Sequence, residues 1–373
     1  MTPARILHVV SAGQVGGTER VVSYLASTSR SRPTQHAVAV FAASSDVMNL
    51  YRAGSSRVHV RGLVREHWPA FMWRSFGPRD LAWLIGVAEE EKSQIIHLHN
   101  IGGQVVGTRA ALRLGLPIVR TEHSLGDYTS RARWMFASWS LRRSQAAVAV
   151  SRGLAREIVT KAPWLSTKLR VVLNGIPVPP AMPAYPDRQG DGAFRFVTVA
   201  RLEPRKGLDL ALEALVAVPG ATLDIVGDGE SRGFLEQHAR ALGVWGRVKF
   251  HGFTADPSAI VAHGHAALSS SREEGLGLAL IEAMALGRPV IAVPVGGIPE
   301  IVRHGETGLL ARARTSKDLA AVMAQAVAHP QDCRRMGTAA RAFVESSLSA
   351  AAMAQAYDEI YQAALAAQDR TGG

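Results

Sequence analysis

The chain is poor in the groups that cross-link a protein or anchor it in a bilayer. Cys333 is the only cysteine among 373 residues, so an intrachain disulfide is excluded and a reducing compartment is expected. No stretch of about 18 uncharged apolar residues occurs, which predicts that nothing spans a bilayer. The chain runs directly into the buried-strand pattern Arg5–Val10 without the pattern of a signal peptide. We therefore expect a cytoplasmic protein, with association at the inner face of the membrane as an added hypothesis.

Lysine is scarce as well, so arginine carries most of the positive charge. Lysine and arginine together number 42 against 31 acidic residues, a net charge of +11, and only six of the 42 are lysines. Arginine suits phosphate, and a basic surface favours anionic partners such as phosphate-bearing small molecules or an anionic membrane. A GC-rich genome explains the same excess without any function. No zinc-finger, homeodomain or RNA-binding sheet motif occurs, so nucleic acid is not expected as a partner.

Strand-like and helix-like segments alternate along the whole chain. The length favours two domains of roughly 150–200 residues each. Near-continuous apolar strands separated by helices predict parallel sheets covered on both faces, and the Pro- and Gly-rich stretch 177–192 is the natural linker. We predict an α/β protein of two doubly wound domains, with ligands beyond the carboxyl ends of the strands. The expected strands are Ile6–Val10, His36–Phe41, Val58–Val60, Ile95–His99, Ile118–Thr121, Ala147–Val150, Val171–Leu173, Phe194–Ala200, Thr222–Val226, Val248–Phe250, Ala267–Ser269 and Val290–Ala292.

Two segments that directly follow strands carry groups suited to a diphosphate. Gly16 and Gly17 precede a helix, where glycine lets the backbone approach a ligand and free N–H groups suit phosphate. The segment lacks the Gly-x-Gly-x-x-Gly fingerprint, which argues against a nicotinamide enzyme. Arg201 and Lys206 lie at opposite ends of a loop, and two cations at that reach can hold a diphosphate between them. A tight turn and a solvated basic loop are the structural alternatives, although positive charge at a helix start is mildly unfavourable.

Two glutamates bracket a Gly-rich turn and the start of an apolar helix. Glu274 and Glu282 are separated by seven residues. Glu282 falls on the helix face of Leu278 and Ala285, which should pack inward, and a carboxylate there is costly unless something pairs with it. Sugar and ribose hydroxyls are donors that a carboxylate can accept. The favourable placement of acidic residues at a helix N-terminus explains Glu274 easily but Glu282 poorly.

Together, these motifs resemble the retaining glycosyltransferases of family four over essentially the whole chain. The resemblance rests on the Gly-Gly-x-Glu opening at Gly16, the Arg-x-x-x-x-Lys motif of Arg201 and Lys206, and the two-glutamate segment, in which Leu276 stands where the family more often has Phe. It implies the GT-B fold of two facing Rossmann-like domains. Residues 1–180 would bind the acceptor, 190–345 would bind the nucleotide sugar, and 346–373 would form a helix and tail that cross back to the first domain.

The resemblance also implies roles for individual residues. His123 follows an expected strand in a segment similar to the family's Thr-x-His and should position the transferred sugar, with a purely structural histidine as the alternative. Glu274 should be catalytic beside the donor sugar, and Glu282 should accept the ribose hydroxyls. The other implied donor-site residues are Gly16, Gly17, Arg201 and Lys206 at the diphosphate, Gly275, Gly277 and Leu278 at the sugar and ribose, and Gly227, Gly252, Phe253 and Thr254 near the base.

The implied activity is transfer of a sugar, with retention, from a nucleotide diphosphate sugar to a hydroxyl on a sugar, lipid-linked or other acceptor. The setting would be bacterial polysaccharide, glycolipid or other glycoconjugate biosynthesis. No cofactor is expected besides this co-substrate, and no metal, since no Asp-x-Asp lies on a promising loop. A nucleotide-sugar epimerase of the same architecture and a non-catalytic sugar- or nucleotide-binding protein are the alternatives.

Two further features stay open at this level. His97 and His99 end a strand and would suit zinc, but no third ligand stands at a convincing spacing. The stretches 68–76 and 131–143 combine Trp, Phe and Arg, which suits a membrane interface or a lipid-linked acceptor. Core packing with acceptor-pocket lining is the alternative, and it explains both stretches slightly better.

Overall fold

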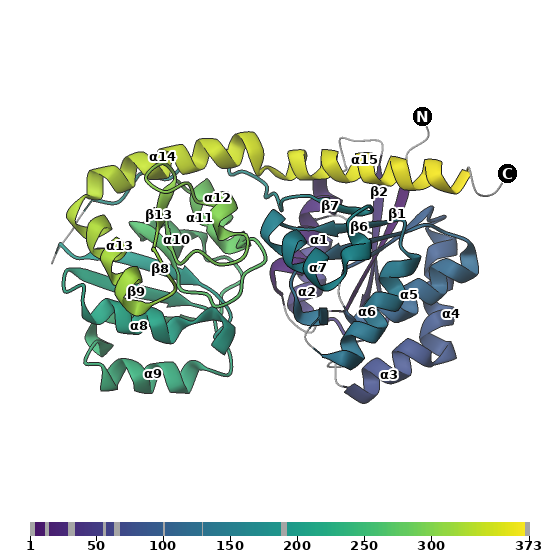
Figure 1. The fold of residues 1–373 in the computed structure, drawn as a ribbon, viewed down its shortest axis with the longest axis horizontal. Coiled ribbons are helices and arrows are strands. Elements are labelled where there is room, and N and C mark those ends of the chain that lie inside the picture. The colour runs from purple at the N-terminus through teal and green to yellow at the C-terminus, as the bar shows by residue number, and fades with distance from the viewer. Residues whose placement is uncertain are drawn as a thin grey trace. The chain divides into compact units, whose positions relative to one another are not determined.

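The chain forms two compact units in a computed structural model that describes residues 4–11, 15–28, 34–54, 57–62, 68–99, 101–128, 130–187 and 192–369. The first unit joins Met1–Gly175 to Ala350–Gly373, and the second is Ile176–Ser349 (Figure 1). Each unit has its own sheet and its own hydrophobic core.

The first unit is built on a parallel sheet with helices on both faces (Figure 1). Its strands are β1 (Arg5–Ser11), β2 (Gln35–Phe41), β3 (Arg57–Val60), β4 (Ile95–Leu98), β5 (Ile118–Glu122), β6 (Ala146–Ala149) and β7 (Leu169–Val171). Within the described residues they lie in the order β3-β2-β1-β4-β5-β6-β7. All residues of β4 and β5 are buried, as expected for apolar strands covered on both sides. The helices are α1 (Gly17–Thr28), α2 (Ser45–Ala53), α3 (Trp68–Phe76), α4 (Pro78–Glu90), α5 (Ile101–Leu114), α6 (Arg131–Arg143), α7 (Arg152–Lys161) and α15 (Ala350–Asp369).

The C-terminal helix α15 packs on the first unit, although the second unit precedes it in the sequence. It contacts α1 and β5 and runs along the unit in yellow in Figure 1. Asp358 accepts a hydrogen bond from the Thr34 hydroxyl at 2.6 Å, and the buried Tyr361 hydroxyl is hydrogen-bonded to His97 Nδ1 at 2.8 Å. This confirms the predicted helix that returns to the first domain.

The second unit is also a parallel sheet between helices. Its strands are β8 (Phe194–Val199), β9 (Ala221–Val226), β10 (Val248–Gly252), β11 (Ala266–Ser269), β12 (Val290–Ala292) and β13 (Gly308–Leu310). Their order in the described chain is β10-β9-β8-β11-β12-β13. The helices are α8 (Leu208–Val216), α9 (Arg232–Ala241), α10 (Ser258–His263), α11 (Leu278–Ala285), α12 (Ile298–Ile301), α13 (Ser316–Ala328) and α14 (Pro330–Ser347). The central strands β8 and β11 bring their carboxyl ends to one edge, where the loops of the candidate site begin.

The predicted fold class is confirmed: two parallel, doubly wound sheets. Some local expectations were wrong. β7 ends at Val171, where a strand was expected to begin, and β13 lies in a segment interpreted only as turns. The aromatic and arginine-rich stretches 68–76 and 131–143 form α3 and α6.

Candidate active site

Two loops of the second unit, far apart in sequence, are held against each other. One follows β8 and contains the turn Pro204–Lys206, and the other follows β11 and spans 270–277. Gly207 permits their close approach: its φ of 60° is left-handed, and a Cβ there would lie 2.2 Å from the carbonyl oxygen of Ser270. The Ser270 hydroxyl donates to the Lys206 carbonyl at 3.3 Å. A side chain at position 207 would therefore separate the two loops.

Arg272 connects the same two loops with its side chain. Its guanidinium donates to both carboxylate oxygens of Asp209, at 2.5 and 2.8 Å, and to the Pro204 carbonyl at 2.7 Å. The hydrogen bond from Arg272 holds the pKa of the Asp209 carboxyl below its ordinary value. Sequence analysis missed this pair, because nothing in a single sequence indicates that residues 63 positions apart will meet.

The connected loops bring Lys206 and Glu274 together. Lys206 Nζ donates to Glu274 Oε2 at 2.6 Å, and each side chain is only 16% exposed. The Ser271 hydroxyl donates to the same carboxylate oxygen at 3.3 Å. An ammonium group has three N–H donors, so Lys206 can keep this ion pair and still donate to an incoming anion.

The backbone of Glu274 is held from a third loop. Gly296 has a left-handed φ of 56°, and a Cβ there would lie 1.7 Å from the carbonyl oxygen of Glu274. The amide of Gly297 donates to that oxygen at 3.4 Å. Only glycine fits at position 296, so the loop after β12 is part of the support for Glu274.

The remaining residues expected at the sugar and ribose follow Glu274 directly. Gly275 is half-buried, and Gly277 adopts a φ of 94° to start α11. Leu278 is the first residue of that helix and is buried. Glu282 lies one turn further along α11 and is half-buried. The two glutamates therefore share one continuous turn-and-helix segment.

Arg201 occupies a more open position than Lys206. Its side chain is 49% exposed and pairs with Glu203 at 3.0 Å, and Glu203 also accepts from Arg205 at 2.6 Å. Exposed ion pairs of this kind are weak. Arg201 can thus exchange its partner for a ligand at little cost.

The residues expected near the base lie at the ends of neighbouring strands. The Gly227 amide donates to the Gly252 carbonyl at 2.8 Å, and a Cβ on Gly227 would lie 1.9 Å from the carbonyl oxygen of Ala200. Phe253 is 55% exposed and Thr254 is half-buried. The loops after β8, β9 and β10 are therefore in close backbone contact.

In the first unit, Gly16 and Gly17 lie at the start of α1. The Gly16 amide donates to Glu19 Oε2 at 2.9 Å, and Gly17 is the first, exposed residue of the helix. Glu19 therefore caps the helix from within, as an acidic side chain near a helix N-terminus commonly does. A ligand phosphate at this point would compete with Glu19 for the amide.

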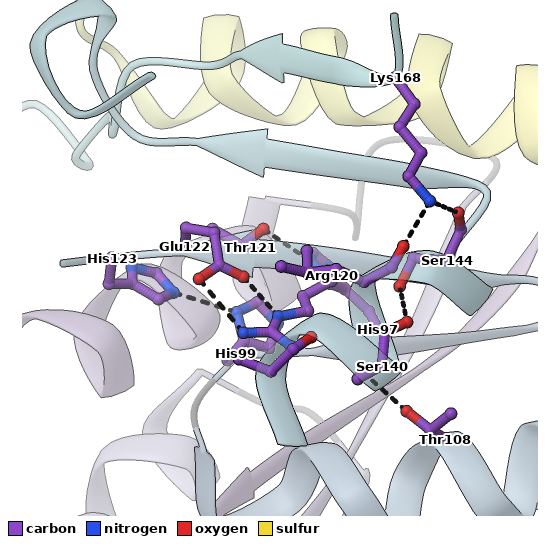
Figure 2. Close-up of polar contacts among 12 residues, drawn as sticks. His97, His99, Thr108, Arg120, Thr121, Glu122, His123, Ser140, Ser144 and Lys168 are labelled. Atoms are coloured by element: carbon purple, nitrogen blue, oxygen red, sulfur yellow. Dashed lines mark hydrogen bonds and ion pairs between the residues drawn. The ribbon is translucent and has the colours of Figure 1, made fainter. Parts of the chain in front are cut away.

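His123 directly follows β5 (Figure 2), and its side chain is half-buried. Its Nε2 is hydrogen-bonded to His99 Nδ1 at 3.3 Å. Burial lowers the pKa of His123 to about 4, so the ring is neutral near neutral pH. A neutral imidazole can accept a hydrogen bond from a hydroxyl, which an imidazolium cannot.

Behind His123 lies a group of buried histidines that sequence analysis only partly found. His8 on β1 and His36 on β2 join His97 and His99, and β1 and β4 are in a register that sets His8 beside His97. His8 is the third histidine that the zinc interpretation lacked. His8 Nδ1 and His99 Nε2 are hydrogen-bonded at 2.8 Å. Two nitrogens bound to one zinc ion at about 2.0 Å each lie about 3.3 Å apart in tetrahedral geometry, so binding would require the rings to separate.

The five buried or half-buried histidines should make the protein sensitive to acid. Burial lowers the pKa of His36 and His123 to about 4 and those of His8, His97 and His99 well below the ordinary value. Between about pH 6.5 and 4 the unfolded chain binds more protons than the folded one, so the free energy of unfolding falls as the pH falls. For His36 and His123 we expect a loss on the order of 1–2 kcal/mol each at pH 5, with a further loss in the same direction from the other three rings, measured by urea unfolding across pH 5–8. Replacing the exposed His263 with Gln should leave this slope unchanged, and stability that stays level from pH 7.5 to 5 would contradict the prediction.

Comparison with known proteins decides the family. The model for "Glycosyltransferase Family 4" matches residues 15–178, and the model for "Glycosyl transferases group 1" matches residues 188–343. The chain belongs to the group 1 glycosyltransferases of the family 4 type. Its matched segments cover both units and contain every residue discussed above as a candidate for the donor site.

Relatives of this glycosyltransferase act in different settings. It is 28% identical to a glycogen synthase of Mycobacterium tuberculosis over 296 residues, which is 75% of this chain and 71% of the relative. It is 31% identical to a D-inositol 3-phosphate glycosyltransferase of Rhodococcus erythropolis over 286 residues, 67% of this chain and 64% of the relative. HepE from Anabaena, solved in complex with UDP and glucose, shares the fold with a TM-score of 0.82 at 23% identity, covering 96% of this chain and 99% of that one. In the part of the chain that the structure describes, every helix is too short or too polar to cross a membrane.

Proposed function

We propose that this glycosyltransferase moves a sugar, with retention of configuration, from a nucleoside diphosphate sugar to a hydroxyl-bearing acceptor. The bond from the anomeric carbon to the β-phosphate oxygen breaks, and a bond from the same carbon to the acceptor oxygen forms on the same face. The acceptor proton passes to the departing phosphate, so the products are a glycoside and a nucleoside diphosphate. The growing charge of the leaving group is stabilised by protein cations in place of a metal ion.

The observation that carries this proposal is the Lys206–Glu274 pair between the connected loops. Lys206 is held at 2.6 Å from the carboxylate, so its position does not depend on the ligand. Its remaining N–H donors, with the more open Arg201, would hold the diphosphate and stabilise it as it leaves. Glu274 would lie beside the sugar and Glu282 would accept the ribose hydroxyls. Gly275, Gly277 and Leu278 would line the same region, with Gly227, Gly252, Phe253 and Thr254 near the base.

The first unit would supply the acceptor side. His123 would accept a hydrogen bond from a hydroxyl of the transferred sugar, a task suited to its neutral ring. Gly16 and Gly17 would approach the diphosphate through backbone amides. HepE from Anabaena was crystallised with UDP and glucose, which supports a nucleotide sugar as the class of donor.

A panel of nucleoside diphosphate sugars tests the proposal. The cognate donor should raise the melting temperature by mass action, and it alone should be slowly hydrolysed to free nucleoside diphosphate without an acceptor. Proton NMR of the product formed with an acceptor should show the anomeric configuration of the donor. An inverted product would refute retention, and a panel without stabilisation or nucleotide release would refute the donor class. Unchanged activity in EDTA would support metal-independent transfer, and its loss would contradict it.

We also propose that the chain associates with anionic membranes through α3 and α6. Phe136 of α6 packs against Phe76 of α3 with ring centroids 5.8 Å apart. Around this contact Trp73 and Met135 are 66% and 58% exposed, and α6 contains no acidic residue. Exposed aromatic and arginine side chains on adjoining helices suit the interface of an anionic bilayer.

Removing two arginines from α6 should weaken this association. Arg131 and Arg133 are both exposed, and each basic residue near an anionic surface contributes about 1 kcal/mol. The double change to Ala should lower the partition coefficient into phosphatidylserine-containing vesicles by about 30-fold in low-salt sedimentation. The matched control removes Arg334 and Arg335, which are exposed on α14. Equal losses in both variants, or no sedimentation of the unaltered protein, would count against a specific membrane surface.

A further inference from the structure

Four histidine rings of the first unit form one continuous chain of hydrogen bonds. His36 Nδ1 is bonded to His8 Nε2 at 2.7 Å, His8 Nδ1 to His99 Nε2 at 2.8 Å, and His99 Nδ1 to His123 Nε2 at 3.3 Å. The rings come from β2, from β1 and from the ends of β4 and β5. This chain of hydrogen bonds therefore crosses the sheet. It ends at His123, the ring proposed to contact the sugar.

Because each neutral ring carries a single N–H, this chain of hydrogen bonds has only two ordered states. Burial keeps all four rings neutral near pH 7, so each ring carries one N–H. His8 and His99 use both of their nitrogens, so each must donate through one and accept through the other. In one state every N–H points toward His123, which then carries its proton on Nδ1. In the other every N–H points toward His36, and His123 carries its proton on Nε2.

A negative charge at one end distinguishes the two states. Asp358 on α15 acts electrostatically on His36, opposing the effect of burial on its pKa. Its carboxylate is fixed by the Thr34 hydroxyl at 2.6 Å. An N–H dipole is stabilised when its hydrogen end points toward negative charge. Asp358 thus favours the state in which every N–H along the chain points toward His36.

We propose that His36, His8 and His99 are positioning residues that fix His123 as the Nε2–H tautomer, with its Nδ1 unprotonated. Nδ1 of His123 is then an obligate acceptor, able to take a hydrogen bond from a hydroxyl and unable to donate one. The catalytic consequence rests on the proposed role of His123 at the sugar, whereas the tautomer itself does not. His97 is not part of this chain of hydrogen bonds, since its two nitrogens are hydrogen-bonded to Tyr361 and Thr121, each at 2.8 Å.

The tautomers can be read directly in the full-length protein. With ¹⁵N-labelled histidine at about pH 7.5, where these rings are neutral, long-range ¹H–¹⁵N correlation spectra report which nitrogen of each ring carries the proton. We expect His8, His36, His99 and His123 all to be Nε2–H. An Nδ1–H His123 in the unaltered protein would overturn the proposal.

Three variants test the direction and the continuity of this chain of hydrogen bonds. Asp358→Asn removes the charge but keeps an oxygen for Thr34, and it should turn the single tautomer of His123 into a mixture. His8→Leu breaks the chain with the same result, whereas His8→Gln, which has a donor and an acceptor on one side chain, should keep His123 as Nε2–H. If His8→Leu does not fold, Asp358→Asn still decides. An unchanged His123 tautomer in Asp358→Asn, or in His8→Leu where that variant folds, would overturn the proposal, whether or not sugar transfer is detected, so its failure is distinct from failure of the proposed function.

Discussion

Replacing Lys206 with Ala should reduce the turnover of sugar transfer by about 100- to 1000-fold, or about 3 kcal/mol of transition-state stabilisation. The loss should fall mainly on kcat, because the charge on the departing diphosphate is greatest as the glycosidic bond breaks. Lys206 is the cation fixed by Glu274 at 2.6 Å, so its ammonium is already positioned before the donor arrives. Steady-state kinetics with the cognate donor and acceptor would measure the effect.

Two controls separate this electrostatic role from a loss of folding. Lys249→Ala removes the same group from an exposed position on the edge strand β10 and should leave kcat unchanged. Lys206→Arg keeps the positive charge and should recover part of the turnover. Near-normal turnover in Lys206→Ala would refute its assignment to the leaving group, and so would a loss fully explained by a lower melting temperature.

The sequence predicted the fold, but it did not predict which side chains of the candidate site would contact one another. Alternation of apolar strands with helices was sufficient for the two parallel sheets, because both faces of each sheet are covered and the strands are apolar throughout. The family resemblance assigned Lys206 to the diphosphate and Glu274 to the sugar, but it did not predict that the two side chains would pair at 2.6 Å. Nothing in the residues themselves indicated that Arg272 would bind Asp209 or that Gly296 would lie against the backbone of Glu274.

The missed features share a physical cause. Hydrogen bonds between histidines on β1, β2 and β4 depend on strand order and register, and neither is visible in one strand's sequence. β13 has three residues, too few to show a period. Helix α6 has three aromatic residues between arginines near its two ends, so its composition suggested a surface role before it suggested a helix.

Breaking the buried ion pair beside His123 should strongly reduce stability at neutral pH. Arg120 is fully buried, and Glu122 is nearly so. The Arg120 guanidinium donates to both carboxylate oxygens of Glu122 and to the Ala137 carbonyl of α6 at 3.0 Å (Figure 2). Glu122→Leu removes the carboxylate that balances a buried guanidinium charge, and the free energy of unfolding should fall by about 3–5 kcal/mol. Denaturant unfolding at neutral pH would measure the loss.

A double-mutant cycle shows whether the lost free energy of unfolding comes from the buried charge whose counter-charge has been removed. Arg120→Met with Glu122→Leu removes both charges and should recover most of the stability lost in either single variant, because two buried charges gain little over apolar groups of similar volume. As a control, Glu306→Ala breaks the exposed Arg303–Glu306 pair, whose side chains are 53% and 57% exposed, and should cost less than about 1 kcal/mol. Additive losses in the double variant would mean that Arg120 and Glu122 act separately, Arg120 chiefly through its bond to α6. If the double variant instead regains stability, the loss in each single variant comes from the one buried charge that is left without its counter-charge.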